Sequence, residues 1–515
     1  QLFRYFNYPW GWTSLIGTTI VTFILVLFHI PITEFTINMG DVIIGLFSIS
    51  SLYILCIIIT EKRLIAFFSG LIFAILPVHV ALSRSVTVNN MYSTTLFFLT
   101  LCFFMSYFKQ SEEERKKSKK NLACGMIALG FYLGADNQFP GILPVLFVSG
   151  LLFYSNKKMF QRIMWVFKAF FNKYFFFFFC VNIPLILGAI YLTQKGLFRS
   201  SYLNLFHSKP LIFGFYYTDF FRALYDDAGP VLVVIFVISF VYTFCCTFCK
   251  KEQKNVRFFL LFWFSITAFP WLFLLSSDVA WFQLYIMQPL SCLVIMTAFF
   301  FHDVMKGIGS IQRPWFRVMT MTISLTIISF IFISTLASTS NLVYKTNYFG
   351  WQFTPIFGQV GENIGIKTIG YYVREHTPLE STIFVDVESF VGQYYLDRSI
   401  IGDLDMTSEQ IYNNLLSFMV EKKKLEKDDH STLPFEYVFI HKKHFTLVGP
   451  VLEMNGYQVI SIAVDNKGET IARLYGTRNN ETLILKPVVL QIEIYDPLFD
   501  QKYGTLDNLY INYGE

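Results

Sequence analysis

Long apolar segments recur along the first two thirds of the chain and end near Ala337. Runs of about 18 or more apolar residues with few charges have the length of a helix that crosses lipid hydrocarbon. The pattern therefore predicts a polytopic α-helical membrane protein. The segments span 12–32, 40–60, 64–82, 91–108, 121–135, 140–155, 174–193, 230–249, 258–276, 283–301 and 318–337.

The connections between these segments alternate in charge. One set carries 20 Lys and Arg residues, and the other carries five. Because basic loops remain in the cytoplasm, we predict the first set there and the second set, with everything after Ala337, on the opposite, outer side. The basic set is 61–63, 109–120, 156–173, 250–257 and 302–317. The outer set is 33–39, 83–90, 136–139, 194–229 and 277–282.

The outer loop 83–90 separates two apolar helices and contains Arg84, Asn89 and Asn90. These side chains cannot enter lipid at low cost, so the loop must face water or a polar cavity. We interpret it as the roof of the active site of a membrane enzyme.

Further polar groups follow on the same predicted side. The long loop 194–229 mixes aromatic and charged residues, which suits a segment lying along the membrane face. It either covers a substrate or packs in the interface. Polar residues at helix ends either line a common pocket or act as helix caps and interface anchors. They are Asp136, Asn137, Gln138, Asp278, Gln283, Tyr285 and Gln288.

After Ala337 the pattern changes to short helices and strands. We expect a helix at 366–374, strands at 382–386 and 437–440, and a hairpin over 457–475. Further helices are expected near 388–396 and 406–424. Such alternation predicts a small soluble α/β domain. No glycine-rich phosphate loop follows the strands, so nucleotide binding is not expected there.

Composition narrows the function classes. The chain is 54% hydrophobic and 15% charged, and its small positive net charge follows membrane topology without indicating nucleic acid. All eight cysteines lie in or beside apolar segments, so the soluble part has neither a disulfide framework nor a zinc site. Cys245, Cys246 and Cys249 either bind a metal or are lipid-facing thiols at a helix end, and we favour the second interpretation.

Three loose motifs resemble, in order and sidedness, those of GT-C fold glycosyltransferases that use polyprenyl-phosphate sugars. This group includes protein O-mannosyltransferases, the lipid A aminoarabinose transferase and, more distantly, the oligosaccharyltransferase catalytic subunit. The resemblance covers residues 5–340. The motifs are Tyr8-Pro9-Trp10-Gly11, Ile75-Leu76-Pro77-Val78-His79 with Ser83-Arg84-Ser85, and Trp281-Phe282-Gln283-Leu284-Tyr285-Ile286-Met287-Gln288-Pro289.

The resemblance implies an architecture for the whole chain. Residues 1–39 end the first external loop, within which 12–32 forms a juxtamembrane helix that does not cross. Residues 40–340 form a GT-C-like transmembrane domain with ten crossings, and 341–515 form an extracytoplasmic α/β domain. One further helix and the family's essential acidic residue are expected upstream of Gln1. The protein would be integral to the plasma or inner membrane, or to the endoplasmic reticulum of a eukaryote.

The chain departs from the family pattern at three places. Asn89 or Asn90 occupies the position where many relatives have an aspartate in the second external loop. Gln283 replaces a frequent basic residue, and Asn137 and Gln138 lie near where some relatives keep a lysine. Either the chain is a divergent branch with other groups on the donor phosphate, or its activity has been lost.

The implied reaction is an inverting displacement at the sugar C1, with a carboxylate as base and polyprenyl phosphate as leaving group. Arg84 is expected to contact the phosphate, because guanidinium binds it bidentately; its alternative role is an interfacial anchor. The other donor-binding candidates are Asn89, Asn90, Asn137, Gln138, Arg222, Gln283 and Tyr285. The carboxylate candidates are Asp136, Asp219 and Asp278.

The resemblance also implies the partners. They are membrane lipid, a polyprenyl-phosphate sugar and a protein, lipid or glycan acceptor, with no nucleic acid. No covalently bound cofactor is implied, and a divalent metal is not indicated.

Two rival classes fit the apolar segments. A transporter or flippase for a lipid-linked sugar leaves the outer domain and the aromatic loop unexplained, and the other rival is a catalytically inactive scaffold of the same fold.

Overall fold

The computed structural model describes most of the predicted helices and strands. The described residues are 24, 27–29, 34–83, 90–110, 119–135, 141–153, 159–194, 212–213, 220–221, 224–225, 228–249, 252–275, 287–344, 366–385, 396, 398–401, 436–464 and 469–477. The chain divides into two compact units, a helical unit within 35–344 and a sheet unit after Tyr344.

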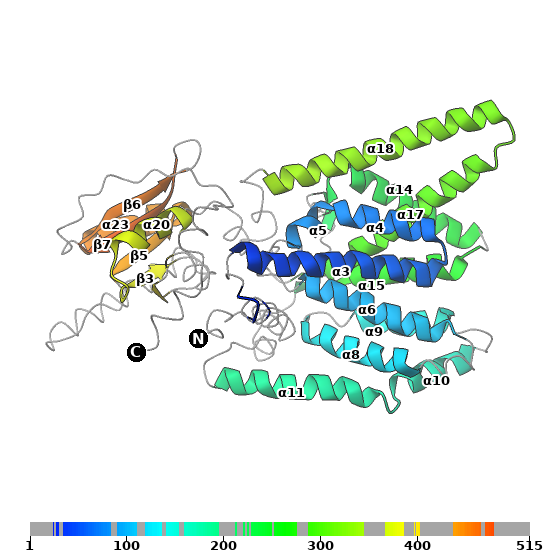
Figure 1. Cartoon of the computed structure of the whole chain (residues 1–515), viewed down its shortest axis with the longest axis horizontal. Helices are drawn as coiled ribbons and strands as arrows, with labels where there is room; N and C mark the ends of the chain where they lie inside the picture. The colour runs from blue at the N-terminus through cyan, green and yellow to red at the C-terminus, as the bar shows by residue number, and fades with distance from the viewer. Residues whose placement is uncertain are drawn as a thin grey trace. The chain divides into compact units, whose positions relative to one another are not determined.

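Each of the ten apolar segments predicted from residue 40 onward contains a helix (Figure 1). The helices of these segments are α3 Glu34–Thr60, α4 Arg63–Ile75, α5 Pro77–Leu82, α6 Asn90–Phe108, α8 Lys119–Ala135, α9 Ile142–Phe153, α11 Phe175–Gln194, α14 Pro230–Cys249, α15 Lys254–Phe273, α17 Met287–Gly309 and α18 Pro314–Tyr344. One more helix, α10 Met159–Phe170, lies in the basic connection 156–173. The segment 12–32 lies almost wholly outside the described residues, so its juxtamembrane placement stays a prediction.

The predicted segment 64–82 is two helices rather than one. Helix α4 ends at Ile75 and α5 begins at Pro77, and Leu76 between them has an extended backbone with φ −62° and ψ 124°. Proline disfavours helical backbone in the preceding residue and suits the first turn of a helix. The break is therefore a consequence of Pro77, and it produces a short separate helix that leads to Ser83.

The helical unit has the surface of an integral membrane protein. Five of the described helices are long and apolar enough to cross a membrane, and a sixth span results if the pair α10 and α11, bent by 41°, counts as one. Large apolar side chains such as Phe330 and Ile333 are more than half exposed, which is typical of contact with lipid. The predicted total of about ten crossings stays a prediction.

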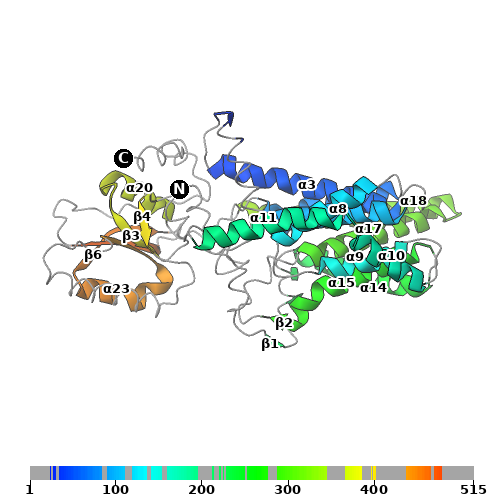
Figure 2. The ribbon, with the colours of Figure 1, turned by 90° about the horizontal axis from the view of Figure 1, so that it is seen from below.

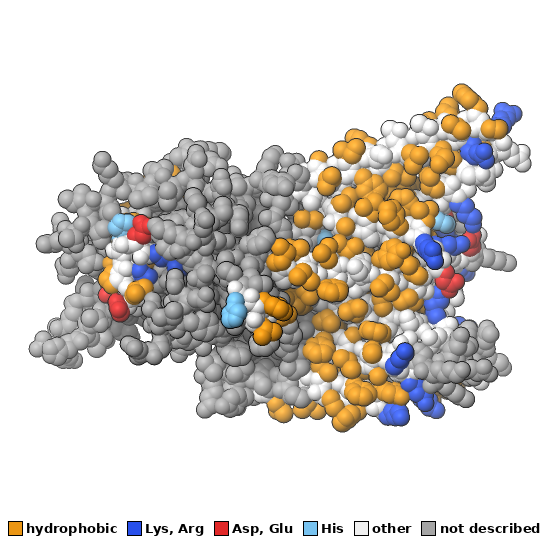
Figure 3. Space-filling model, viewed as in Figure 1, with side chains coloured by type: hydrophobic (Ala, Val, Ile, Leu, Met, Phe, Trp, Pro, Cys, Tyr) orange, Lys and Arg blue, Asp and Glu red, His pale blue; other side chains and the backbone are white. Residues whose placement is uncertain are grey.

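The basic connections meet at one end of the helical unit. Lys109 donates a hydrogen bond to the carbonyl oxygen of Ile58 at 2.7 Å, and the Gln253 amide donates to the carbonyl oxygen of Thr60 at 2.9 Å. The Asn255 amide reaches the carbonyl oxygen of Leu152 at 3.2 Å. Figure 3 shows Lys and Arg side chains of this unit gathered at that end, with apolar side chains over the rest of the face in view.

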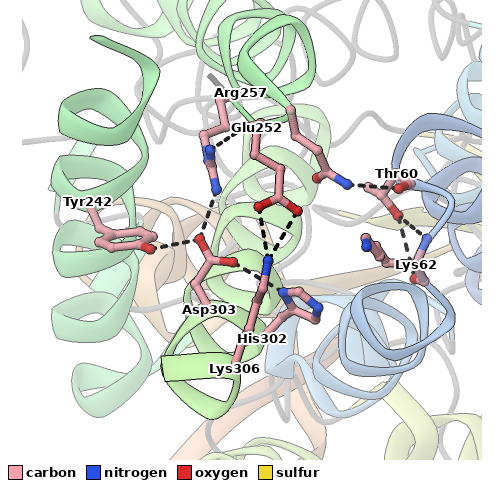
Figure 4. A network of polar contacts seen from close by, with 9 residues as sticks. Thr60, Lys62, Tyr242, Glu252, Arg257, His302, Asp303 and Lys306 are labelled. Carbon is pink, nitrogen blue, oxygen red and sulfur yellow. Dashed lines mark hydrogen bonds and ion pairs between the residues drawn. The ribbon is translucent and has the colours of Figure 1, made fainter. Parts of the chain in front are cut away.

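A buried ion pair lies inside this basic end (Figure 4). The Arg257 guanidinium donates to Asp303 Oδ2 at 2.8 Å, and the hydroxyl of Tyr242 donates to the same oxygen at 2.7 Å. The two charged side chains are only 4% and 13% exposed. Nearby, Lys306 and Glu252 form a second pair at 2.9 Å whose side chains are 60% and 58% exposed. One carboxylate thus joins α14, α15 and α17.

The sheet unit contains a five-stranded mixed sheet. Its strands follow the order β4 Ser399–Ile401, β3 Thr382–Val385, β5 Tyr437–His441, β7 Thr470–Thr477 and β6 Tyr457–Val464. Strand β3 pairs in parallel with β4 and β5, whereas β7 pairs antiparallel with β5 and β6. The antiparallel pair β6 and β7 is the hairpin that the sequence predicts.

Helices cover both faces of this sheet, as Figure 2 shows. Tyr437 and Phe439 of β5 pack with α20 (Ile366–His376), and the intervening Val438 and Ile440 pack with α23 (Phe445–Met454). Because successive side chains of a strand point to opposite faces, every residue of β5 is buried. A strand covered on both faces reads as a continuous apolar run, which made β5 predictable.

Two elements of the sheet unit escaped sequence prediction. Strand β4 has three residues at the edge of the sheet, and α23 contains Pro450 in its interior. A three-residue strand carries too little alternation to be recognised, and an internal proline argues against a helix. The helices expected at 388–396 and 406–424 lie almost wholly outside the described residues, and the extracytoplasmic placement of this unit stays a prediction.

Candidate functional site

The predicted site residues lie in connections that the structure leaves undescribed. Ten of the eleven candidates fall outside the described residues, and Asn90 is described only as the first residue of α6. The ten are Arg84, Asn89, Asp136, Asn137, Gln138, Asp219, Arg222, Asp278, Gln283 and Tyr285. What the structure does describe are the helix ends that carry these residues, and the contacts that hold those ends.

Both flanks of the Arg84 loop are held by α3. Before the loop, the backbone of Gly45 comes so close to Ser83 that a Cβ on the glycine would lie 2.6 Å from the Ser83 Cβ. After the loop, the Thr95 hydroxyl in α6 donates to the carbonyl oxygen of Met91 at 2.7 Å and also lies 3.3 Å from the carbonyl oxygen of Ile44 in α3. Adjacent residues of one helix therefore position the two ends between which Arg84 lies.

A second contact between α3 and the α5 segment is polar and buried. The Ser48 hydroxyl donates its proton to the carbonyl oxygen of Gly45 at 2.6 Å and lies 2.9 Å from Nε2 of His79. Which of these two atoms supplies the proton depends on the tautomer of the imidazole. The imidazole is 3% exposed and lies against the ring of Phe73, with centroids 4.5 Å apart.

The other ring nitrogen of His79, Nδ1, meets no hydrogen-bond partner among the described residues. Buried polar atoms without a partner are rare in native proteins, and each costs about 1–3 kcal/mol. His79 therefore has one ring nitrogen without a described partner, in α5, five positions before Arg84 in the sequence.

A second buried bond joins two more helix ends. The Gln288 amide in the first turn of α17 donates to the hydroxyl of Tyr132 at 2.8 Å, near the end of α8. Tyr132 also packs against Phe97, whose ring lies 5.2 Å from that of Trp263. This bond connects the helix that precedes Asp136, Asn137 and Gln138 with the helix that follows Gln283 and Tyr285.

The long loop 194–229 is attached to the same part of the helical unit. Its Ile212–Phe213 strand, β1, pairs antiparallel with Leu274–Leu275, β2, directly after α15. Phe220 from the same loop is buried and packs edge-on against Phe264. The structure thus brings the loop that contains Asp219 and Arg222 to the chain that leads to Asp278.

Sequence reasoning named His79 only as the last residue of a motif, without a role, and it missed Ser48 and Tyr132. A serine or tyrosine in a helix carries no signal alone. Their partners are 31 and 156 positions away in the chain. Gln288, in contrast, is among the polar groups that the sequence placed at helix ends. In the part of the chain that the structure describes, no group of three His, Cys, Asp or Glu is arranged to hold a metal.

Gly45 gives the first testable prediction. Glycine inside a helix costs about 0.5–1 kcal/mol relative to alanine, so its presence in α3 is explained by the close approach of Ser83. Replacing Gly45 by alanine is expected to lower the free energy of unfolding in detergent by about 1–3 kcal/mol, because the Ser83 end of α5 must move away.

The matched control is Gly307→Ala in α17, where an added Cβ would meet no atom of another part of the structure within 4 Å. That substitution should be neutral or stabilise by up to about 1 kcal/mol. Equal effects of the two substitutions would show that α3 and α5 do not depend on this contact.

Comparison with known proteins places this helical arrangement in a class. The sequence matches no protein-family model and no curated protein sequence. Solved structures, however, share its fold at low identity. ArnT from Cupriavidus metallidurans in the apo state aligns with a TM-score of 0.57 and 11% identity, over 91% of this chain and 88% of that one. The class defined by these matches is the GT-C fold, as the sequence motifs predicted.

Two further structures show the range of this class. ArnT bound to undecaprenyl phosphate aligns with a TM-score of 0.55 and 12% identity, over 93% of this chain and 89% of that one. The Archaeoglobus fulgidus oligosaccharyltransferase, in complex with Zn and sulfate, aligns with a TM-score of 0.53 and 13% identity over 91% of this chain. This chain spans 65% of the length of that oligosaccharyltransferase.

Proposed function

We propose that this protein is a membrane glycosyltransferase that moves a sugar from a polyprenyl-phosphate carrier to a protein, lipid or glycan acceptor. The observation that carries the proposal is the shared fold with ArnT over nearly the full length of both chains, including the form bound to undecaprenyl phosphate. The acceptor peptide tethered to the oligosaccharyltransferase in a further structure of that protein supports a protein acceptor in particular.

The reaction takes place at the end of the helical unit opposite to the basic end. Helices α5 and α6 flank the Arg84 loop there, Asp136, Asn137 and Gln138 follow α8 in the sequence, and Gln283 and Tyr285 precede α17. The basic end lies in the cytoplasm, because Lys and Arg are retained on that side. Sugar transfer and the sheet unit are therefore on the outer or lumenal side.

Each candidate has a role in an inverting displacement at the sugar C1. Arg84 binds the leaving phosphate, whose negative charge grows in the transition state. The side-chain amides of Asn89, Asn137 and Gln283 help to hold the phosphate or the sugar. An aspartate accepts the proton of the attacking acceptor group, or orients that group. The remaining members of these sets are Asn90, Gln138, Arg222 and Tyr285 for the donor, and Asp136, Asp219 and Asp278 for the carboxylate.

Transfer of a radiolabelled sugar tests the proposal. The purified protein in detergent is mixed with a polyprenyl-phosphate sugar and with membrane extract as the source of acceptor. Label is expected to leave the lipid fraction and appear in protein, lipid or glycan. Movement of the lipid-linked sugar between leaflets of a vesicle without transfer would instead identify a transporter. If the protein neither transfers the sugar nor moves the lipid-linked sugar, it is an inactive scaffold of the same fold.

A further inference from the structure

We propose that α10 and the turn that joins it to α11 form a binding surface for an anionic phospholipid of the membrane around the protein. Lys168 and Lys173 contact the phosphate of the headgroup, and an exposed apolar stripe of α10 contacts the acyl chains. The inference is independent of the proposed function, because it concerns the basic end of the helical unit and no step of sugar transfer.

Helix α10 has three faces of different chemistry. Val166 and Ala169 are buried against the rest of the unit. A second face is apolar and exposed, and its residues recur at spacings of four and three, so they form one stripe along the helix. The stripe contains Phe160, Met164, Phe167 and Phe171, which are between 49% and 73% exposed. The third face lies beside the stripe and contains Gln161, Trp165 and Lys168. Such a division is typical of a helix at a membrane surface.

The contacts of α10 fix its depth in the membrane. Val166 and Phe108 meet at Gly150 of α9, where an added Cβ would lie 2.6 Å from a methyl carbon of Val166 and 3.2 Å from the ring of Phe108. Helix α6 has 19 residues, about the length that crosses the hydrocarbon, and Phe108 is its last. The α10 stripe therefore lies at the edge of the hydrocarbon, at the end of the unit where Figure 3 shows the Lys and Arg side chains.

Two exposed lysines lie beside aromatic rings at this depth. The Lys168 ammonium is 5.6 Å from the centroid of the Trp165 ring, and the Lys173 ammonium is 5.3 Å from that of the Tyr174 ring. Trp and Tyr are enriched where hydrocarbon meets headgroups, and a lysine there keeps its ammonium in the polar layer. Both ammonium groups are therefore at the level of the lipid phosphates.

Asn172 orders the backbone between the two lysines. Its side-chain amide donates to the carbonyl oxygen of Ala169 at 2.8 Å, and its side-chain oxygen accepts from the backbone N–H of Tyr174 at 2.6 Å. This turn separates α10 from α11, which are bent by 41°. Because the turn is held by the protein itself, a lipid does not have to order it on binding.

The charges of this region complement an anion. Residues 159–194 include Arg162, Lys168 and Lys173 but no Asp or Glu. Within the described part of the chain, neither Lys168 nor Lys173 forms an ion pair with a carboxylate, whereas Lys109 and Lys306 at the same end do. Basic residues at a membrane surface attract anionic lipids, and the adjacent apolar stripe favours a phospholipid over a free anion.

Binding of a radiolabelled lipid tests the inference. The purified full-length protein is immobilised in neutral detergent and titrated with radiolabelled phosphatidylglycerol or phosphatidylcholine. We expect phosphatidylglycerol to bind about 10-fold more tightly, and high salt to remove most of that preference. The salt measurement requires no variant, so it tests the ionic contact even if a substitution prevents folding.

Two double variants assign the preference to this surface. Lys168→Gln with Lys173→Gln should bind the two lipids with affinities within about 3-fold of each other. The matched control, Lys119→Gln with Lys120→Gln, removes the same charge from two exposed lysines in the first turn of α8, also at the basic end. It should keep the wild-type preference. An equal loss in both double variants would mean that the charge of the whole end attracts the lipid, and would overturn the proposed surface.

The apolar stripe and the source of the phosphate are tested separately. Phe160→Gln with Met164→Gln keeps every charge and should weaken phosphatidylglycerol binding about 10-fold, because contacts with acyl chains are lost. Inorganic phosphate in large excess should displace little of the lipid, because it has no acyl chains. The inference is wrong if inorganic phosphate displaces the lipid, or if the stripe variant binds as the wild type does. It is also wrong if the lysine variant keeps the preference or high salt leaves it unchanged.

Discussion

Arg84→Ala is expected to reduce sugar transfer about 100- to 1000-fold while leaving the stability of the protein in detergent nearly unchanged. Removing one hydrogen-bond donor that stabilises a charge developing in the transition state has an effect of this size in other enzymes. Lysine keeps the charge but cannot bind a phosphate bidentately, so the transfer rate of Arg84→Lys should lie between those of the wild type and Arg84→Ala. The measurement is kcat for transfer from a radiolabelled polyprenyl-phosphate sugar at saturating donor.

The control for this prediction is Arg317→Ala. Arg317 is exposed near the start of α18, at the basic end, and its loss should alter transfer less than about 2-fold. Transfer by Arg84→Ala within 3-fold of the wild-type rate would remove Arg84 from the site and leave it as an anchor in the membrane interface.

The sequence predicts the helices of this protein well, because a long apolar run has few alternatives in a membrane. The break before Pro77 was missed, because 64–82 was predicted as one helix. The sequence does not predict which buried polar residues meet, since that depends on how helices pack. Ser48 and His79, or Tyr132 and Gln288, become neighbours only through tertiary structure. Strand β5 was predictable as a continuous apolar run, but the position of β3 between β4 and β5 was not.

The same limit applies to the candidate site. Sequence reasoning alone assigns Arg84, Asn137 and Gln283 to one side of the membrane, and the structure shows how the helices next to them in the sequence are joined. Their roles stay predictions, because their connections lie outside the described residues. At the basic end, the structure shows a contact that the sequence did not predict. Its residues were interpreted only as topology signals, yet the structure reveals that Arg257 and Asp303 form a buried pair.

Breaking that pair is expected to have the largest effect on stability. Arg257→Ala should lower the free energy of unfolding by about 3–5 kcal/mol, because it leaves the carboxylate of Asp303 buried without its main counter-charge. Tyr242 would still donate to that oxygen, but a neutral hydroxyl does not compensate a charge. The measurement is a denaturant titration of the purified protein in detergent micelles.

The exposed pair nearby provides a control at the same end of the unit. Lys306→Ala removes an ion pair whose side chains are more than half exposed, and such pairs contribute at most about 1 kcal/mol. The double variant Arg257→Met with Asp303→Leu should be more stable than Arg257→Ala, because no unpaired charge remains inside. If Arg257→Ala lowers the free energy of unfolding no more than Lys306→Ala does, water reaches Asp303. Helices α14, α15 and α17 would then be joined by apolar packing instead.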